Sequence, residues 1–374
     1  MRKLRVAWLG HKSAKGGDGI ITYSREITSA LRARGVEIVF FHHAQEPDLV
    51  PDRTSISLDA VQLSHRLVIS PPRSRRKLID LLQEHEIDVV HVSISFSSLD
   101  FNLPALCHRL GIPIVATFHV PFDVRFGVWG GLTSAVYRLY SQALSACDRV
   151  VIFGPTQRDI LIKLGVPAGV VRVLPNGVDV DKYSPGPSQK RAEFGAARLF
   201  SYVGRIDPEK NVDVLLRAFL DADPPADLKM IVVGGGSERR RLERRYRDPR
   251  VIFTGMITDE ADRIAILRAS DAFFLPSSVE GLSLAMLEAM ACGVATIATD
   301  VGSDGDSLRG AGIVIEPKEL EAQLSLAIHQ MIELPALAPW LGGLARERAL
   351  ERFSLAANVD GLLRMYGELL PEPV

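Results

Sequence analysis

Two series of short apolar runs, rich in Val, Ile and Phe, limit what this chain can fold into. The first series comprises residues 4–9, 36–41, 88–92, 114–118, 149–153 and 171–174, and the second comprises residues 199–203, 228–233, 251–253, 272–275 and 295–298. Amphipathic stretches separate the runs. Strands that are apolar on both faces and alternate with helices are typical of a parallel sheet covered by helices. The sequence therefore predicts two similar α/β units in tandem.

The length of the chain and one stretch of prolines and glycines place the boundary between the units. A chain of 374 residues is longer than a single hydrophobic core usually supports, so two domains are expected. Periodicity is lost from residue 175 to residue 187, where Pro and Gly cluster, and this stretch is the predicted joint. Residues 353–370 are expected to form a C-terminal amphipathic helix.

Charge and cysteine content exclude several classes of protein. Lys and Arg number 44 against 45 Asp and Glu, a formal net charge of −1, so no overall positive field favours nucleic acid as a partner. Cys107, Cys147 and Cys292 form no CxxC pair, which indicates a reducing compartment without structural zinc or disulfides. The apolar run 6–9 is too short for a signal peptide, and no run reaches about 18 apolar residues. The protein is therefore expected in the cytoplasm or peripheral on a membrane.

The first apolar run leads into a glycine-rich segment that can approach a phosphate. Gly16, Gly17 and Gly19 precede a predicted helix at residues 20–31, and glycines there let backbone N–H groups reach an anion at the helix N-terminus. The Rossmann pattern GxGxxG fails at Thr22, and the sequence contains no P-loop motif. A plain turn is the alternative interpretation.

Two cations flank the turn that follows Gly204. Arg205 and Lys210 would lie at the carboxyl end of a strand, where two fixed cations can hold a diphosphate. The alternative is a pair of surface cations that Asp207 and Glu209 neutralise.

Two glutamates lie eight residues apart after the apolar run 272–275. Glu280 is expected in the loop and Glu288 two turns into the next helix, so about 10 to 12 Å would separate them at the helical rise per residue. A carboxylate can accept both hydroxyls of a sugar diol, and the backbone N–H groups of residues 281–284 are expected to face phosphates. Two glutamates near a helix start are also common in proteins without any such role.

Together these motifs closely resemble those of the retaining glycosyltransferases of family 4. The resemblance is carried by Gly204-Arg205 with Lys210, by Glu280 to Glu288, by Thr117-Phe118-His119, by Pro175-Asn176-Gly177-Val178-Asp179 and by Gly234-Gly235-Gly236. It implies the GT-B fold, an α/β architecture of two Rossmann-like, doubly wound parallel-sheet domains that face across a cleft. The N-terminal, acceptor-binding domain would comprise residues 1–177 with 353–374, and the C-terminal, nucleotide-sugar-binding domain residues 178–352.

The resemblance also implies a reaction, the transfer of a sugar from an NDP-sugar with retention of anomeric configuration. Arg205 and Lys210 would hold the diphosphate. Glu288 would hold the ribose hydroxyls, Glu280 the transferred sugar, and His119 the C6 side of that sugar. The expected donor-binding residues are Gly16, Gly17, Gly204, Arg205, Lys210, Gly281, Leu282, Ser283, Leu284 and Glu288, and the expected catalytic residues are His119, Arg205, Lys210 and Glu280. No cofactor and no tightly bound metal is expected.

Three D-x-D sequences support the alternative, a metal-dependent site. Asp179-Val-Asp181, Asp221-Ala-Asp223 and Asp304-Gly-Asp306 match the pattern with which other transferases hold Mn²⁺ or Mg²⁺ on a diphosphate. With 45 acidic residues such matches arise by chance, and Arg205 with Lys210 already supplies the countercharge.

The acceptor is expected on the N-terminal half, where a basic helix indicates contact with a membrane. The expected membrane and acceptor residues are Arg73, Arg75, Arg76, Lys77, Phe126 and Trp129. Basic residues beside an apolar stripe can lie on anionic lipid. The alternative is a solvated basic helix start whose stripe faces the core.

A narrower resemblance suggests a glycolipid acceptor. Residues 22–27, 113–122 and 184–188 resemble the cyanobacterial-type digalactosyldiacylglycerol synthases of the family. This implies an α-linked transfer of galactose from UDP-galactose to monogalactosyldiacylglycerol, on the thylakoid or plasma membrane if the chain is cyanobacterial. The alternatives are a family 4 transferase with another lipid or a soluble acceptor and a glucose, mannose or N-acetylglucosamine donor, an NDP-sugar epimerase of the same fold, and a non-catalytic nucleotide-sugar-binding protein.

Overall fold

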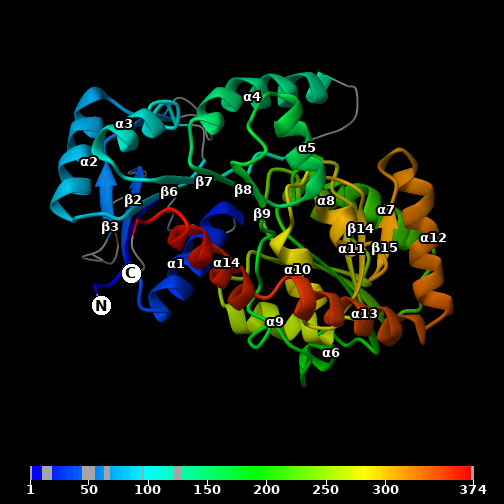
Figure 1. Cartoon of the computed structure of the whole chain (residues 1–374). Coiled ribbons are helices and arrows are strands. Elements are labelled where there is room, and N and C mark those ends of the chain that lie inside the picture. Colours follow the sequence, from blue (N-terminus) through cyan, green and yellow to red (C-terminus); the bar gives the residue numbers. More distant parts are fainter. Residues whose placement is uncertain are drawn as a thin grey trace. The chain divides into compact units, whose positions relative to one another are not determined.

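The structure, a computed structural model, describes residues 2–10, 19–43, 55–62, 68–94, 97–121 and 128–371, without the side chains of residues 62 and 128–133. The chain forms two compact units (Figure 1). Unit 1 comprises Met1–Pro175 with Ala356–Val374, and unit 2 comprises Asn176–Leu355. These boundaries lie two or three residues from the predicted ones.

Unit 1 is built on a seven-stranded sheet with the order β3-β2-β1-β6-β7-β8-β9, in which all ladders are parallel. Its elements are β1 (Arg5–Gly10), α1 (Gly19–Ala33), β2 (Glu37–His43), β3 (Ser55–Leu58), β4 (Val61–Gln62), β5 (Val68–Ile69), α2 (Pro72–Glu84), β6 (Val89–Ser93), α3 (Leu103–Leu110), β7 (Ile114–Thr117), α4 (Val128–Ser145), β8 (Arg149–Ile152), α5 (Pro155–Lys163), β9 (Val171–Val173) and α14 (Leu355–Gly367). Every residue of β6 and β7 is buried, because helices cover both faces of the sheet.

Unit 2 is built on a six-stranded parallel sheet with the order β12-β11-β10-β13-β14-β15. Its elements are α6 (Lys190–Glu193), β10 (Arg198–Val203), η1 (Pro208–Lys210), α7 (Val212–Asp221), β11 (Leu228–Val233), α8 (Arg239–Arg245), β12 (Val251–Gly255), α9 (Glu260–Ala269), β13 (Ala272–Leu275), α10 (Leu284–Ala291), β14 (Ala295–Thr299), α11 (Asp304–Leu308), β15 (Ile313–Ile315), η2 (Pro317–Glu319), α12 (Leu320–Glu333) and α13 (Leu337–Arg352). Phe200, Phe219 and Phe274 are fully buried in its core, where Phe219 and Phe274 each pack against Phe200.

Both sheets reverse their strand order at one point. In unit 1 the order turns between β1 and β6, and in unit 2 between β10 and β13. Open α/β sheets bind ligands beyond the carboxyl ends of the strands at such a switch point. The loops after β10 and β13 are therefore where a ligand of unit 2 is expected.

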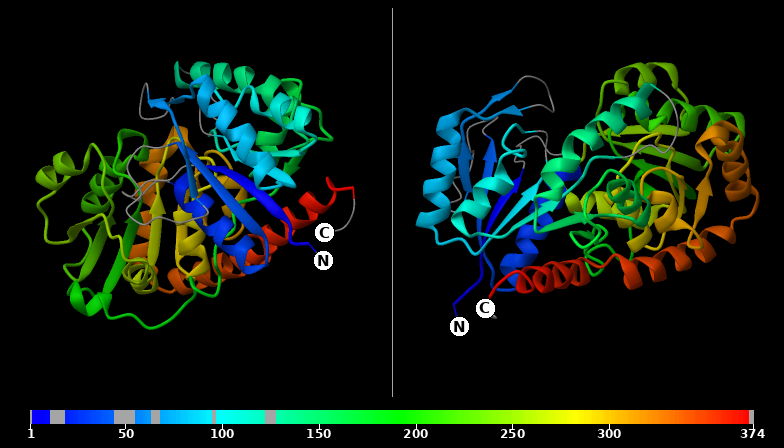
Figure 2. Two further views of the ribbon diagram at one scale, coloured as in Figure 1. Left: turned by 90° about the vertical axis from the view of Figure 1, so that its left-hand side faces the viewer. Right: turned by 45° about the horizontal axis from the view of Figure 1, so that its top comes forward.

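The predicted fold class is confirmed, since both units are doubly wound parallel sheets and each of the eleven apolar runs contains a strand. The sequence pattern missed β3, β4, β5 and β15, which have only two to four residues each. The C-terminal helix begins at Leu355 rather than at residue 353. Figures 1 and 2 show this helix, α14, beside α1 within unit 1, where Asp360 pairs with Arg34.

Candidate active site

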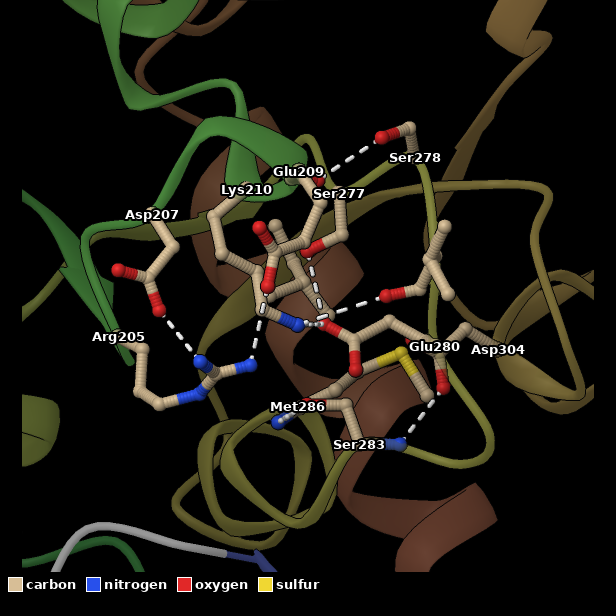
Figure 3. Close-up of polar contacts among 12 residues, drawn as sticks. Arg205, Asp207, Glu209, Lys210, Ser277, Ser278, Glu280, Ser283, Met286 and Asp304 are labelled. Atoms are coloured by element: carbon tan, nitrogen blue, oxygen red, sulfur yellow. Dashed lines mark hydrogen bonds and ion pairs between the residues drawn. The ribbon is translucent and has the colours of Figure 1, made fainter. Parts of the chain in front are cut away.

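The loops after β10 and β13 are joined by hydrogen bonds at the switch point of unit 2. Asn211 Nδ2 donates to the carbonyl oxygen of Pro276 at 2.9 Å, and the Ser278 amide donates to the carbonyl oxygen of Glu209 at 2.8 Å. Side chains of both loops consequently face one small volume (Figure 3).

The centre of this volume is an ion pair between Lys210 and Glu280. Lys210 Nζ lies 2.6 Å from Glu280 Oε1, and only 8% of Lys210 is exposed. Ser277 Oγ donates to the same carboxylate oxygen at 2.7 Å. The structure thus brings together two residues that the sequence predicted for one site from motifs 70 positions apart. A cation and a carboxylate held this way can bind an anionic group and a hydroxyl side by side.

Arg205 lies on the same edge of the sheet and is engaged by neighbouring acids. Its guanidinium pairs with Asp207 and, at 3.0 Å, with Glu209 (Figure 3). Burial opposes ionisation of Asp207, but hydrogen bonds from Ser237 lower the pKa of its carboxyl below the ordinary value. The alternative interpretation, in which acids of the turn neutralise Arg205, describes this arrangement. A bound diphosphate would have to compete with those two acids for the guanidinium.

The triple-glycine segment after β11 packs directly against the Arg205 turn. Gly234 and Gly236 have φ values of 141° and 153°. A Cβ atom at Gly234 would collide with the carbonyl oxygen of Gly204, and one at Gly236 with that of Ile206. Glycine is therefore required because the two backbone segments approach each other so closely.

The loop after β13 caps helix α10 and leaves most of its amides available. Ser283 is the N-cap, and its Oγ accepts from the Met286 amide at 3.3 Å. The amide of Ser283 donates to Asp304 Oδ1 at 2.8 Å, so the expectation that all amides of residues 281–284 are available to a ligand is wrong for Ser283. Within the described part of the chain, no acceptor is found for the amides of Gly281, Leu282 and Leu284.

Glu288 lies about one turn into α10, not two turns as the sequence predicted. Its charge acts together with burial to raise the pKa of Tyr183 and to raise the pKa of Cys292 to about 12. Burial lowers the pKa of Arg263 of α9, but neighbouring groups, Glu288 among them, raise that pKa above its ordinary value. Glu288 is half-buried, and its role toward a ribose stays a prediction.

In unit 1, His119 follows β7 and lies among aromatic rings. The Tyr23 ring meets it edge-on with centroids 4.7 Å apart, and the Phe153 ring lies at 5.2 Å. His119 is half-buried, and its catalytic role stays a prediction.

A buried hydrogen-bond chain runs from the C-terminal helix to the strand that precedes His119. Tyr366 Oη lies 2.5 Å from His91 Nδ1, and His91 Nε2 lies 2.7 Å from Thr117 Oγ1. Thr117 Oγ1 is also 3.3 Å from the hydroxyl of Tyr23. Burial, with the His119 charge, lowers the pKa of His91 to about 3, so His91 is neutral at pH 7.

Two family models match the chain, one on each side of the joint. Residues 17–182 match Glycosyltransferase Family 4, and residues 197–333 match Glycosyl transferases group 1. The chain belongs to the family 4 glycosyltransferases. This confirms the family that the sequence motifs indicated.

Named relatives of this glycosyltransferase differ in their acceptors. It is 32% identical over 284 residues to the D-inositol 3-phosphate glycosyltransferase of Rhodococcus opacus, a match that covers 69% of this chain and 62% of the relative. It is 25% identical over 323 residues to the UDP-Gal:alpha-D-GlcNAc-diphosphoundecaprenol alpha-1,3-galactosyltransferase of Escherichia coli, covering 81% of each chain. The match therefore spans less than two thirds of the first relative.

A solved structure shares the fold of this glycosyltransferase. Alr3699/HepE of Anabaena, crystallised in complex with UDP, superposes with a TM-score of 0.79 at 17% identity. The superposition covers 98% of this chain and 100% of that one. At this identity the likeness concerns the fold alone.

The D-x-D sequences of this glycosyltransferase differ in their surroundings. Asp304 is fully buried whereas Asp306 is exposed, so their carboxyls do not face one site. Asp179 Oδ1 accepts from the amides of Asp181 and Lys182, a turn-forming role. Among the described residues, no group of three or more His, Cys, Asp or Glu side chains is arranged to hold a metal ion. Whether the reaction needs a metal stays a prediction.

The basic helix α2 buries the apolar stripe that was expected to face lipid. Leu78 and Leu82 are fully buried in the core of unit 1, so the alternative interpretation of a core-facing stripe holds and the lipid-facing stripe is wrong. Arg73 pairs with Asp59 at 2.9 Å, and Lys77 Nζ donates to the carbonyl oxygen of Ser57. The exposed members of the basic cluster are Arg73, Arg76 and Lys77, with Arg75 half-buried. In the part of the chain that the structure describes, no helix has the length and apolarity that crossing a membrane requires.

Some predicted residues cannot be placed. Gly16, Gly17 and Phe126 lie outside the described residues, as does the side chain of Trp129.

The sequence did not predict two residues of the site. Ser277 donates to Glu280, and Asp304, which the sequence suggested only as a metal ligand, accepts from the Ser283 amide. Ser277 stands in the loop between β13 and Glu280, so its place in the sequence offered a signal. Asp304 offered no such signal, because it lies 21 positions from Ser283, whose amide donates to it.

Proposed function

We propose that this glycosyltransferase transfers a hexose, with retention of configuration, from a nucleotide diphosphate sugar to a glycolipid. The specific proposal is transfer of galactose from UDP-galactose to monogalactosyldiacylglycerol, which yields digalactosyldiacylglycerol. The observation that carries the nucleotide-sugar donor is the buried Lys210–Glu280 pair beside Arg205 at the switch point of unit 2.

Each site residue has chemistry that suits one part of the donor. Arg205 and Lys210 supply two positive charges for the leaving diphosphate, which is stabilised most when donors are already in place. Glu280 can accept from hydroxyls of the hexose while Lys210 and Ser277 hold it in position. Following the family resemblance, Glu288 is assigned to the ribose and His119 to the C6 side of the hexose.

Two observations support a lipid-linked acceptor and a galactose donor. The Escherichia coli relative is named for transfer of galactose from UDP-galactose in an α linkage to a diphosphoundecaprenol-linked sugar. The sequence segments that resemble digalactosyldiacylglycerol synthases lead to the same donor and linkage. A soluble acceptor is the second candidate, because the Rhodococcus relative is named for D-inositol 3-phosphate.

The test is incubation of the protein with UDP-galactose, UDP-glucose, UDP-N-acetylglucosamine and GDP-mannose, each with monogalactosyldiacylglycerol, with inositol phosphate and without acceptor. Product mass identifies the transfer. We expect galactosylated glycolipid, and we expect it in excess EDTA as well, because Arg205 and Lys210 face the leaving group. Transfer to inositol phosphate alone would reject the glycolipid, and loss of activity in EDTA with rescue by Mn²⁺ would implicate a metal.

A further inference from the structure

Three consecutive residues of the loop that carries Glu280 are held by side-chain and backbone groups from elsewhere in unit 2. The carbonyl oxygen of Gly281 accepts from the Ser303 amide at 2.6 Å. That of Leu282 accepts from Asn176 Nδ2 at 2.9 Å. The Ser283 amide donates to Asp304 Oδ1 at 2.8 Å. The path of this loop is therefore determined by partners outside it.

The segment of residues 302–304 lies directly against the loop. Gly302 has a φ of 57°, and a Cβ atom there would collide with the carbonyl oxygens of Glu280 and Gly281. This close approach brings Asp304 to the Ser283 amide (Figure 3). A side chain at position 302 would push the two segments apart.

Asp304 is an unusual residue for this position because it is completely buried. It is 0% exposed, and its Oδ2 atom has no hydrogen-bond partner within the described ranges. The charged groups that act on it are Glu280 and Lys210, and Lys210 already pairs with Glu280. Burial, with the Glu280 charge, raises the pKa of the Asp304 carboxyl well above its usual range. Burial thus disfavours the charged form of Asp304, and the contact that the carboxyl makes is that of a hydrogen-bond acceptor for the Ser283 amide.

We propose that Asp304 is a positioning residue for the donor sugar: by accepting from the Ser283 amide it fixes the loop that aims Glu280 at the transferred hexose. This inference rests on the proposed function, in which Glu280 binds the hexose. It assigns Asp304 no contact with the nucleotide, because its hydrogen bond is made to the loop of Glu280 and not to Arg205 or Glu288.

Two substitutions of similar size separate the acceptor from the charge. Asp304→Asn keeps an acceptor oxygen for the Ser283 amide and cannot ionise. Asp304→Leu has the same branched shape, with larger methyl groups in place of the oxygens, and leaves that amide without its acceptor. Asp306→Asn, on the exposed side of the same helix, is the matched control.

The experiment measures the dissociation constants of UDP and of UDP-galactose by calorimetry for the parent and each variant. The ratio of the two constants reports on the hexose alone, since both ligands share the nucleotide. For Asp304→Leu we expect weaker binding of both ligands, because the available amides of the same loop are assigned to the phosphates, and a ratio shifted about tenfold against UDP-galactose. For Asp304→Asn and Asp306→Asn we expect the parent ratio within about twofold.

An unchanged ratio of the two dissociation constants in Asp304→Leu would overturn this inference but not the proposed function. So would a shift in Asp304→Asn as large as that in Asp304→Leu, because charge rather than the acceptor would then be required. If Asp304→Leu does not fold, Asp304→Ala removes the acceptor without adding bulk, and the same outcomes apply. A parent that binds UDP but neither UDP-galactose nor another UDP-sugar would overturn the proposed function and this inference with it.

Discussion

Lys210 is central to the proposed donor site, because it is both a buried cation and the partner of Glu280. Lys210→Met would leave the Glu280 carboxylate without its countercharge. Breaking a buried pair on one side is strongly destabilising, so we expect a loss of at least ~2 kcal/mol in the free energy of unfolding and loss of UDP binding.

A second substitution checks that the loss comes from the unpaired charge. Lys210→Met combined with Glu280→Gln should recover much of the stability and none of the transfer activity. Chemical denaturation gives the free energies. Equal stability of the single and the double variant would show that the pair does not hold the site together.

Asp304 predicts a dependence of stability on pH. Its folded-state pKa is raised, chiefly by burial, so the folded protein holds a proton that the unfolded chain releases above about pH 4. As pH rises above about 4, the free energy of unfolding of the parent should therefore fall relative to that of Asp304→Asn. The fall should be about 1.4 kcal/mol per pH unit until the folded carboxyl ionises. Denaturation at pH 5 and pH 8 checks this. A constant difference between the two proteins would contradict a raised folded-state pKa of Asp304.

The family resemblance assigned Arg205, Lys210 and Glu280 to one site. Their positions agree with it, because each follows a strand of one parallel sheet and such strand ends share an edge. The alternative interpretation of the sequence also named Asp207 and Glu209, the two acids that pair with Arg205. Asp304, by contrast, was missed for a physical reason. Only the close approach of Gly302 to the loop of Glu280 brings Asp304 to Ser283, and no local pattern encodes that approach.

At the scale of elements, helix α14 is tied to the sheet of unit 1 through Tyr366 and His91. Tyr366→Phe would leave a buried ring nitrogen of His91 without its partner, so we expect a loss of ~1 to 3 kcal/mol in the free energy of unfolding. In a His91→Leu background the same substitution should cost much less. Thermal or chemical denaturation of the four proteins gives the coupling, and equal losses in both backgrounds would mean that the bond contributes nothing.

Helix α2 retains the charges, though not the apolar face, expected of a membrane contact. Replacing its exposed cations Arg73, Arg76 and Lys77 by Gln should lower binding to anionic vesicles and activity on a lipid acceptor, because each cation near such a surface contributes about 1 kcal/mol. The effect should disappear at high salt, where charge interactions are screened.

The matched control for α2 is a variant of unit 2 in which three exposed arginines, Arg240, Arg244 and Arg247, become Gln. Vesicle co-sedimentation compares the two variants with the parent. If both variants lose binding equally, or neither does, α2 is an ordinary surface helix.

Long, buried elements could be predicted from the sequence, whereas short ones could not. Each apolar run of the sequence contains a strand, because strands buried on both faces are predominantly apolar. The strand β3, with the sequence Ser-Ile-Ser-Leu, gave no such signal, and β15 has only three residues. The sequence did not predict the break between α13 and α14 at residues 353–354, because helical periodicity continues on both sides of it.

At the scale of the whole molecule, the duplicated order of the two sheets explains where chemistry can occur. Each unit reverses its strand order once, and the best-described site lies at the reversal of unit 2. The C-terminal segment returns to unit 1, so the chain contributes three segments to two units. The family match and the geometry of unit 2 are consistent with the proposed nucleotide-sugar donor. The proposed acceptor site belongs to unit 1, where Gly16, Gly17 and Phe126 lie outside the described residues.

The most direct measurement is a crystal structure of the protein with UDP-galactose. We expect the diphosphate beyond the carboxyl ends of β10 and β13, with Arg205 turned from Asp207 and Glu209 toward it, and the hexose against Glu280 while Asp304 keeps the Ser283 amide. A nucleotide bound elsewhere, or bound there with Arg205 still held by both acids and Glu280 away from the hexose, would contradict the account.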